Sequence, residues 1–311
     1  MIKDAKTILI TVHDSPDSDA LGSAFGLKWA LEKTAKVDVY LHQPIERLFD
    51  FLLPEEYIGK IVKPTLREYD LVIAVDTSTE TRAPHDIRSY VKPDGALMII
   101  DHHVGGDDWG DINIREDVAA TAIIVTNMIK KMNEALITPK VAQALYTGVS
   151  GDTGNFTYSN TDGMAFSVAS YLVNRGVDPA AVSLAFSTKT EAHLRLLSDT
   201  IQNLKIHDEG FATAYITERM IRKNGATQGD AAGMLWHLRN INGCRGFILF
   251  IEDGKDIRIR FRSETENVRE LASVFGGGGH EKASGARVVG ALRDVLLNVE
   301  KEAKEFFKRG A

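Results

Sequence analysis

The chain has 311 residues, of which 44% are hydrophobic and 26% charged, a composition typical of a globular protein long enough for two domains. The formal net charge of −6 excludes a sequence-independent coat for DNA, which needs a basic face, but not nucleic-acid binding at one acidic site that holds cations. A single cysteine excludes a disulfide framework, and no apolar run is long enough to span a membrane, so we expect a cytoplasmic protein.

Apolar runs alternate with amphipathic patterns through the first half of the chain, which predicts a parallel α/β architecture. The expected strands are 7–12, 37–42, 71–75 and 96–100. The expected helices are 20–34, 119–133, 139–151 and 162–176. We therefore expect an N-terminal domain over residues 1–188 with a largely parallel sheet flanked by helices.

The pattern changes near residue 190. The segment 189–208 has a polar, charged face and is expected to form one long helix that links two domains. Beyond it, strands are expected at 211–217, 244–253 and 256–263, and helices at 267–275 and 291–309. We therefore expect a smaller C-terminal α/β domain over residues 209–311 with a mixed sheet.

Acidic and imidazole side chains follow several of the expected elements in the first domain. Eight of them stand after the strands at 7–12, 71–75 and 96–100 or at the end of the helix at 139–151: His13, Asp17, Asp19, Asp76, Asp101, His102, His103 and Asp152. Because ligands bind beyond the carboxyl ends of parallel strands, we expect these side chains to meet at one edge of the sheet.

Each of these residues taken singly also has a structural explanation. An aspartate after a strand commonly caps the next helix, and a lone histidine is more often structural than a ligand. Their joint occurrence favours a site, because unpaired carboxylates are costly to desolvate and no lysine or arginine lies within segments 13–19, 76 and 101–103. We therefore expect divalent cations between the carboxylates.

The ligand types indicate which cation to expect. Carboxylates and imidazoles without a thiolate favour Mn²⁺, with Mg²⁺, Co²⁺ or Zn²⁺ as substitutes. The number of ligands exceeds what one ion needs, which favours two ions that share a carboxylate. Such a pair is suited to the hydrolysis of phosphate esters.

Four motifs in this order, HDSPDSDALGS, VDTS, DHH and GDTGNF, resemble those of the DHH phosphoesterases. Nearer the C-terminus, RFRS, NVRELA and GGGGHEKASGA resemble the DHH-associated domain. The two domains together are similar to the bifunctional oligoribonucleases (nano-RNases) that also dephosphorylate pAp. The resemblance implies a metal-dependent hydrolase that cuts short oligoribonucleotides to mononucleotides and removes the 3′-phosphate of pAp. A homodimer is compatible with this interpretation.

The resemblance also implies a role for each of the eight residues. One ion would be held by His13, Asp17 and Asp76, and the other by Asp19, His102 and Asp152, with Asp76 as the bridge. Asp101 would orient a ligand histidine through a hydrogen bond, a usual partner of metal-bound imidazole. His103 would face the phosphate. The expected catalytic residues are therefore Asp76, Asp101 and His103.

The segment GGGGH, residues 276–280, has two interpretations. It could be a flexible hinge, or its backbone N–H groups could face a phosphate, which the family resemblance favours. Arg262 could likewise be an exposed strand arginine or could pair with a terminal phosphate, and strand alternation puts arginines 258, 260 and 262 on one face. The expected substrate-binding residues are Arg262, Gly277, Gly278, Gly279, His280 and Ser284. Trp236, His237 and the phenylalanines 247, 250 and 261 could stack bases, but most are expected in the core.

Other functions remain open from the sequence. A phosphodiesterase for cyclic or linear dinucleotides such as c-di-AMP or pApA would use the same two domains. RecJ-like exonucleases share both but carry further domains, and DHH pyrophosphatases lack the GGGGH pattern. A non-catalytic nucleotide-binding regulator is disfavoured, because every expected ligand position is filled.

Overall fold

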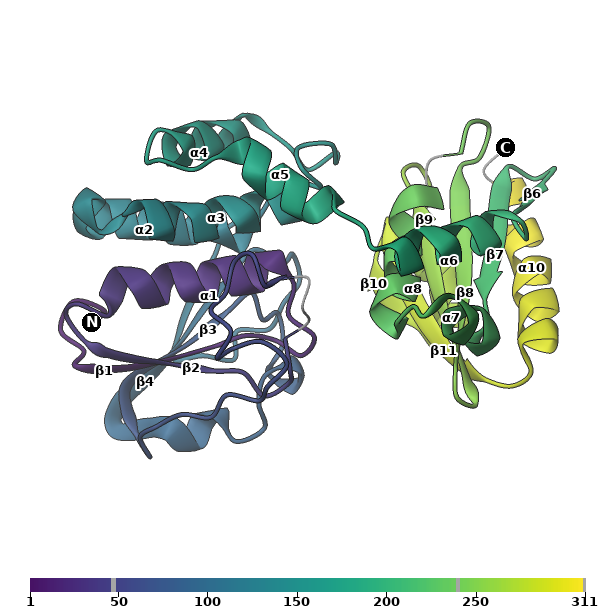
Figure 1. Ribbon diagram of the computed structural model, residues 1–311. Coiled ribbons are helices and arrows are strands. Elements are labelled where there is room, and N and C mark those ends of the chain that lie inside the picture. The colour runs from purple at the N-terminus through teal and green to yellow at the C-terminus, as the bar shows by residue number, and fades with distance from the viewer. Residues whose placement is uncertain (46–48, 239–240, 310–311) are drawn as a thin grey trace. The chain divides into compact units, whose positions relative to one another are not determined.

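The computed structural model describes residues 1–45, 49–238 and 241–309, and the chain divides into two compact units, Met1–Thr188 and Lys189–Ala311 (Figure 1). Each unit is a sheet with helices on its faces, which confirms the expected α/β class. Within these described ranges, no helix combines the length and apolar character that crossing a membrane requires.

The first unit is built on a five-stranded sheet in which all neighbouring strands are parallel. Its order is β2-β1-β3-β4-β5, with bounds β1 Thr7–Thr11, β2 Lys36–Tyr40, β3 Tyr69–Val75, β4 Val91–Asp101 and β5 Ile112–Arg115. The sequence analysis missed β5, because INIR is short and has no continuous apolar run. The order places the carboxyl ends of β1, β3 and β4 next to one another.

Both faces of this sheet are buried, which explains why its strands read as continuous apolar runs. Along β1, Ile8 and Ile10 pack into the main core beneath the helices, whereas Leu9 packs on the opposite face with Val72 and Trp109. That opposite face is covered by two 3₁₀ helices and the chain around them, η2 Glu80–Arg82 and η3 Ile87–Tyr90.

The helices of the first unit stack on the other side of the sheet (Figure 1). They are α1 Ser18–Leu31, α2 Thr121–Asn133, α3 Pro139–Asp152, α4 Gly163–Val173 and α5 Pro179–Ser187, with the 3₁₀ helix η4 Glu134–Leu136 between α2 and α3. Helices α1 and α3 approach to backbone contact, because a Cβ on Gly22 would lie 2.4 Å from the carbonyl oxygen of Ala144 and 2.9 Å from the amide nitrogen of Gly148. The contact joins the start of α1 to the end of α3.

The second unit has a mixed sheet, as expected, and its six strands have the order β10-β11-β9-β8-β7-β6. Strands β7 and β8 are parallel and the other neighbours are antiparallel. The bounds are β6 Lys205–His207, β7 Phe211–Ile216, β8 Gly246–Asp253, β9 Asp256–Ser263, β10 Gly278–His280 and β11 Ala283–Val289.

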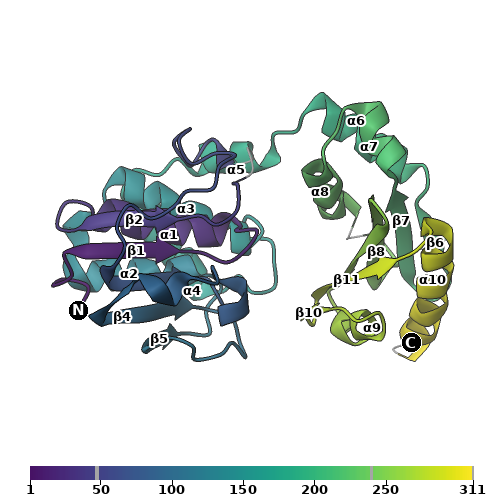
Figure 2. The same cartoon turned by 90° about the horizontal axis from the view of Figure 1, so that it is seen from below.

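Helices cover both faces of this second sheet (Figure 2). One face carries α6 Glu191–Ile201, α7 Glu218–Asn224 and α8 Gln228–Leu238, and the other carries α9 Val268–Val274 and α10 Leu292–Arg309. Side-chain alternation divides the core, so that Phe247 packs on the first face and Phe250 and Phe261 on the second. All three phenylalanines are fully buried and belong to the core.

The linker helix expected over 189–208 is wrong in both extent and role. Helix α6 ends at Ile201, and Lys205–His207 forms the edge strand β6, paired with β7. Leu196 of α6 is fully buried in the core of the second unit. The polar face that suggested a linker is the solvent side of an ordinary amphipathic surface helix.

The glycine contact between α1 and α3 makes a prediction about stability. Gly22→Ala should lower the free energy of unfolding by about 1–3 kcal/mol, because the added methyl group meets backbone atoms that cannot yield without separating the helices. Gly163→Ala is the matched control, since no heavy atom lies within 4 Å of its added Cβ. Urea unfolding followed by the fluorescence of the buried Trp29 and Trp109 measures both variants. Equal stability of the two variants would contradict the close-packing argument.

Candidate metal centre

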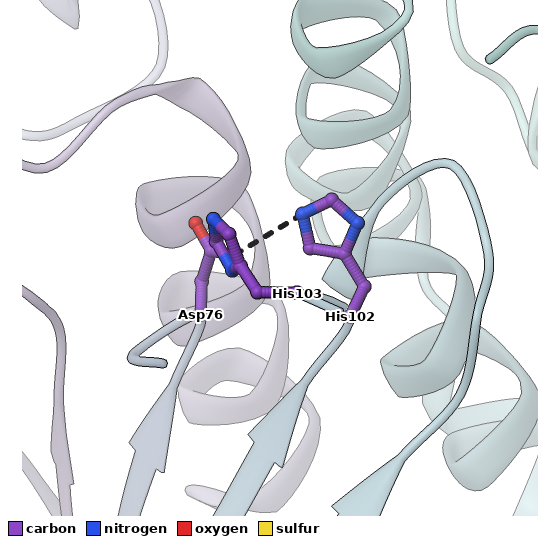
Figure 3. A group of neighbouring side chains, drawn as sticks. All are labelled: Asp76, His102 and His103. Atoms are coloured by element: carbon purple, nitrogen blue, oxygen red, sulfur yellow. Dashed lines mark ion pairs between the residues drawn. The ribbon is translucent and has the colours of Figure 1, made fainter. Parts of the chain in front are cut away.

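The eight residues predicted in the first unit lie together at the carboxyl edge of its sheet. Asp76 directly follows β3, His102 and His103 follow β4, and Asp152 is the last residue of α3. Figure 3 shows the strand ends that carry Asp76 and the two histidines, with the His102 ring directed toward the Asp76 carboxylate. The expected convergence of strand ends is therefore present.

Helix termini fix two of the aspartates. Asp17 is the N-cap of α1, and its Oδ1 accepts hydrogen bonds from the amides of Asp19 (2.9 Å) and Ala20 (3.1 Å). The carboxylate of Asp19 reaches across to the start of α2, where it accepts bonds from the amides of Thr121 (2.6 Å) and Ala122 (2.9 Å). The helix-cap explanation thus holds for Asp17, whereas Asp19 lies in the first turn of α1 and bonds the start of α2, beside the other acidic groups.

Asp76 has the most constrained position of the group. It is 1% exposed, and its backbone has φ of 53°, in the left-handed region that residues other than glycine seldom adopt. Its amide donates to the carbonyl oxygen of Ile100 (2.9 Å), and its Oδ1 accepts from the hydroxyl of Thr121 (3.0 Å). A strained backbone at a strand end, held by these bonds, is a common feature of functional sites.

Two histidines turn their Nε2 atoms toward carboxylates. The Nδ1 of His13 lies 2.6 Å from the carbonyl oxygen of Asp14, and that of His102 lies 3.0 Å from the carbonyl oxygen of Val118. A carbonyl oxygen only accepts, so Nδ1 of His102 donates to Val118 and its Nε2 faces the carboxylates. Nδ1 of His13 contacts both the carbonyl oxygen of Asp14 and the donor Nη2 of Arg82, at 2.8 Å. The Nε2 atoms of both rings lie 3.6 Å from oxygens of Asp76, and that of His102 lies 3.1 Å from Asp152. Such an arrangement is stable only with a proton or a metal cation between the groups.

The side chains form three groups whose ligand atoms all lie within 4.8 Å of one another. They are His13 with Asp17 and Asp76, then Asp19 with His102 and Asp152, and then Asp76 with His102 and His103. The first two match the two expected ligand sets. Carboxylate oxygens and imidazole nitrogens at these separations fit the donor set of hard to borderline divalent cations.

The pKa values of the aspartates show how strongly the carboxylates interact. Burial and the charges of Asp76 and Asp152 raise the pKa of Asp19 well above its ordinary value, and the same causes raise that of Asp17 to about 6. Asp17 remains exposed at the edge of the group, so solvent screens part of this repulsion.

Asp76 and His102 shift in the complementary directions. Burial alone would raise the pKa of Asp76, but the hydrogen bond from His13 and the nearby imidazoles lower it to about 2. Burial would lower the pKa of His102, but Asp152, Asp19 and Asp76 raise it to about 10. The imidazole of His102 therefore holds a proton among these carboxylates, in the place that a metal cation would take.

His103 and Asp101 form a separate pair beside these ligands. The Nδ1 of His103 donates to Oδ1 of the fully buried Asp101 (2.7 Å), and Oδ2 of Asp101 accepts from Arg115. We expected Asp101 to orient a ligand histidine. Instead, the ring of His102 is oriented by its contact with the carbonyl oxygen of Val118, and Asp101 contacts His103. Strand β4 ends at Asp101, and the side chain of His103, two residues later, points back to the Asp101 carboxylate.

Three supporting residues were missed by the sequence analysis. Arg115 on β5 pairs with Asp101, Arg82 places Nη2 2.8 Å from Nδ1 of His13, and Thr121 contacts both Asp76 and Asp19. Arg82 and Arg115 lie outside the motifs, so nothing in the local sequence associates them with the site. Only Thr121 carried a signal, since it stands at the start of an expected helix.

The expected substrate-binding residues lie in the second unit, around β9, β10 and β11. Arg262 of β9 donates from Nη1 to the carbonyl oxygen of Phe261 (2.8 Å), and the Oγ of Ser284 donates to the carbonyl oxygen of His280 (2.7 Å). Residues Gly278–His280 are a strand paired with β11, and Gly279 has φ of +135°. A Cβ on Gly277 would lie 2.2 Å from the carbonyl oxygen of Gly285. Part of the run, Gly278–His280, is therefore an edge strand rather than a loop, which does not support the hinge interpretation.

Comparisons with known proteins agree with this two-part structure. The model of the DHH family, N-terminal domain, matches residues 7–149, and that of the DHHA1 domain matches residues 208–309. The chain is 32% identical over 299 residues to the bifunctional oligoribonuclease and PAP phosphatase NrnA of Bacillus subtilis, covering 91% of this chain and 89% of that protein.

Two solved structures are similar as well. A crystal structure of an exopolyphosphatase-related protein from Bacteroides fragilis superposes with a TM-score of 0.91 at 26% identity, covering 99% of this chain and 94% of that one. RecJ from Thermus thermophilus, solved in complex with Mn²⁺, shares the fold with a TM-score of 0.51 at 13% identity, and the match covers 97% of this chain and 52% of RecJ. Three findings agree: the motifs occur in order, both domain models match, and a relative aligns over nearly its whole length. This chain therefore belongs to the DHH family of phosphoesterases, with a C-terminal DHHA1 domain.

Proposed function

We propose that this protein hydrolyses short oligoribonucleotides to mononucleotides and removes the 3′-phosphate of pAp. The observation that carries the proposal is the pair of ligand sets at the carboxyl edge of the first sheet, where the Nε2 atoms of His13 and His102 face carboxylates. The Bacillus subtilis relative, which is named for both activities, aligns with this chain through both domains. A nucleotide-processing enzyme of this kind would act in the cytoplasm. A homodimer stays a prediction from the sequence.

In this proposal two Mn²⁺ ions bind, with Mg²⁺ or Co²⁺ as substitutes. His13, Asp17 and Asp76 would hold one, and Asp19, His102 and Asp152 would hold the other, with Asp76 as a ligand to both. Ions bound in these sets would neutralise charge on the phosphate and lower the pKa of an attacking water. The mixed carboxylate and imidazole ligands support Mn²⁺. Asp76 is suited to bridge because its two oxygens face different imidazoles, Oδ2 facing His13 and Oδ1 facing His102.

The chain's own groups position the phosphate and handle its proton. Asp101 holds Nδ1 of His103 at 2.7 Å, and Arg115 holds Asp101 in turn, so the ring has one orientation. With Nδ1 held by Asp101, Nε2 of His103 would be the nitrogen that contacts the phosphate, and a proton on it would pass to the leaving oxygen. Thr121 and the α2 amides keep Asp76 and Asp19 in place while the substrate binds.

The second unit would bind another part of the substrate. Arginines 258, 260 and 262 alternate with the buried Ile257, Ile259 and Phe261 along β9, so all three lie on one face, as predicted. Their neighbours across β11 include Ala283 opposite Arg262 and Gly285 opposite Arg260, which are too small to cover the guanidinium groups. We propose that Arg262, the segment Gly277–Gly279, His280 and Ser284 bind a terminal phosphate of the substrate.

The bridging assignment predicts the metal content of matched variants. Protein stripped with EDTA should be inactive and should recover with Mn²⁺. Asp76→Asn should lose both ions, since it removes a ligand from each, whereas Asp17→Asn should keep one. Elemental analysis after dialysis against Mn²⁺ measures this, with the exposed Asp94→Asn as the control that keeps two. Two retained ions and near-normal kcat in Asp76→Asn would exclude the bridge.

The neighbouring histidines should behave differently from each other. His103→Gln should lower kcat by about 10²–10⁴-fold, the usual contribution of a general acid or base, and should keep both ions. His102→Gln should lose the ion that it shares with Asp19 and Asp152. Steady-state kinetics combined with metal counting on both variants separates the two roles. Metal loss in His103→Gln would make it a ligand.

Substrate length tests the proposed function directly. With Mn²⁺ present, kcat/KM for pAp and for RNAs of two to about five nucleotides should exceed that for long strands, because the proposed contact with a terminal phosphate favours short substrates. Arg262→Ala and His280→Ala should lower kcat/KM for short substrates by about one to two decades, from the loss of a charge-assisted contact of about 1.5–3 kcal/mol, and should flatten the length preference.

The same panel distinguishes the alternatives. Preference for c-di-AMP or pApA over pAp and short RNA would replace the proposal with a dinucleotide phosphodiesterase. Equal cleavage of a long strand and a dinucleotide would indicate a RecJ-like exonuclease. Binding of these ligands without turnover would indicate a regulator.

A further inference from the structure

One arginine of the second unit holds its charge without a counter-charge. Arg260, in the middle of β9, is half-buried, and its side chain makes no hydrogen bond and no ion pair with any residue that the structure describes. Burial and the positive charge of Arg258 lower its pKa, so the fold keeps this charge at an electrostatic cost. A guanidinium in such a position is suited to an anion that arrives from solvent.

The neighbouring strands explain why Arg260 is only half covered. On one side it stands opposite Leu249 of β8, which is fully buried in the core beneath α6, α7 and α8. On the other side it stands opposite Gly285 of β11, and Gly285 in turn pairs with Gly278 of β10. Arg260 therefore lies at the border between the helix-covered core and a part of the sheet where the backbone carries no side chains.

Arg262, two residues farther along β9, lies on the same face, and we have assigned it to a terminal phosphate. Alternate residues of a strand are about 6.5 Å apart. This distance is comparable with the spacing of consecutive phosphates, and rows of positive charge commonly follow the backbone of a single strand. Arg260 and Arg262 are therefore placed to contact two phosphates of one ligand through charge-assisted hydrogen bonds.

The arginines beyond this pair are already neutralised. Arg258 contacts Oε1 of Gln228, and its Nε lies 3.4 Å from Oδ2 of Asp253. Arg287, opposite Arg258 on β11, lies 3.3 Å from Oδ2 of Asp253 and 2.9 Å from Oδ2 of Asp256. The two carboxylates stand where β8 turns into β9, and they would repel a further phosphate.

We propose that Arg260 binds a second phosphate of the substrate, beside the terminal phosphate assigned to Arg262, and that Asp253 and Asp256 end the binding row after these two. The inference rests on the proposed function and deepens it by adding a phosphate contact in the second unit. The second phosphate belongs either to the next nucleotide of an oligonucleotide or to a 5′-diphosphate end, since both present the same anionic oxygens.

Ligand binding by the metal-free full chain tests this contact apart from hydrolysis. In EDTA, titration calorimetry on wild-type protein should show pApA binding about tenfold to a hundredfold tighter than its analogue with a neutral methylphosphonate linkage. Arg260→Met should lose this preference. Arg258→Met is the matched control on the same strand and should keep it, because Arg258 is already paired. ADP compared with AMP measures the same preference for a diphosphate end.

Salt dependence and stability separate a phosphate contact from a structural role. For pApA, the slope of log Kd against log salt should be shallower by about 0.7 in Arg260→Met than in wild type, as expected for one lost phosphate contact. Urea unfolding should show Arg260→Met to be at least as stable as wild type, because the substitution removes a half-buried charge that has no counter-charge. Arg258→Met should be less stable, because its contacts with Gln228 and Asp253 are lost.

Equal preference for the charged ligands in wild type and Arg260→Met overturns the inference, and so does wild-type protein without any such preference. Destabilisation of Arg260→Met beyond that of Arg258→Met also overturns it, because the arginine would then be structural. Failure of the proposed function gives a different result. In that case the metal-free chain binds pApA or ADP as expected, but the chain supplied with Mn²⁺ hydrolyses neither pAp nor short RNA.

Discussion

The candidate metal centre depends on the contacts of one buried carboxylate, that of Asp76, with the surrounding imidazoles. Three imidazole nitrogens approach its oxygens, from His13 and His102 at 3.6 Å and from His103 at 3.5 Å. A buried carboxylate without such partners would be costly, and its low pKa records how much positive charge surrounds it. The left-handed backbone at this residue turns the side chain across the sheet edge, where the groups that follow β1 and β4 can reach it.

The helices of the first unit keep the other carboxylates close to Asp76 despite their repulsion. Asp19 is held by the amides at the start of α2, where the helix dipole favours negative charge. Asp152 stands at the end of α3, which contacts the start of α1 through Gly22 and Gly148. The packing that buries the apolar side chains of this unit therefore also sets the separation of the acidic groups. Cations bound there would release the protons that the raised pKa values retain.

The second unit has a different electrostatic character. Its strand β9 presents a row of arginines beside small residues of β11, whereas the first unit gathers carboxylates. Burial and the neighbouring Arg258 lower the pKa of Arg260, so this face holds positive charge at some cost and attracts anions.

The sequence by itself determined the α/β class, the strands β1 to β4, and the eight acidic and imidazole residues of the first unit. It could do so because buried parallel strands are continuous apolar runs and because residues that directly follow them must lie at one edge. Tertiary structure alone decided which side chains meet. The pairing of Asp101 with His103, the position of Arg115 on the unpredicted strand β5, and the contact of His193 with His237 join residues through folding, and no local pattern encodes them. The length of α6 was decided in the same way, because Lys205–His207 gains a strand partner in β7 that a helix would forfeit.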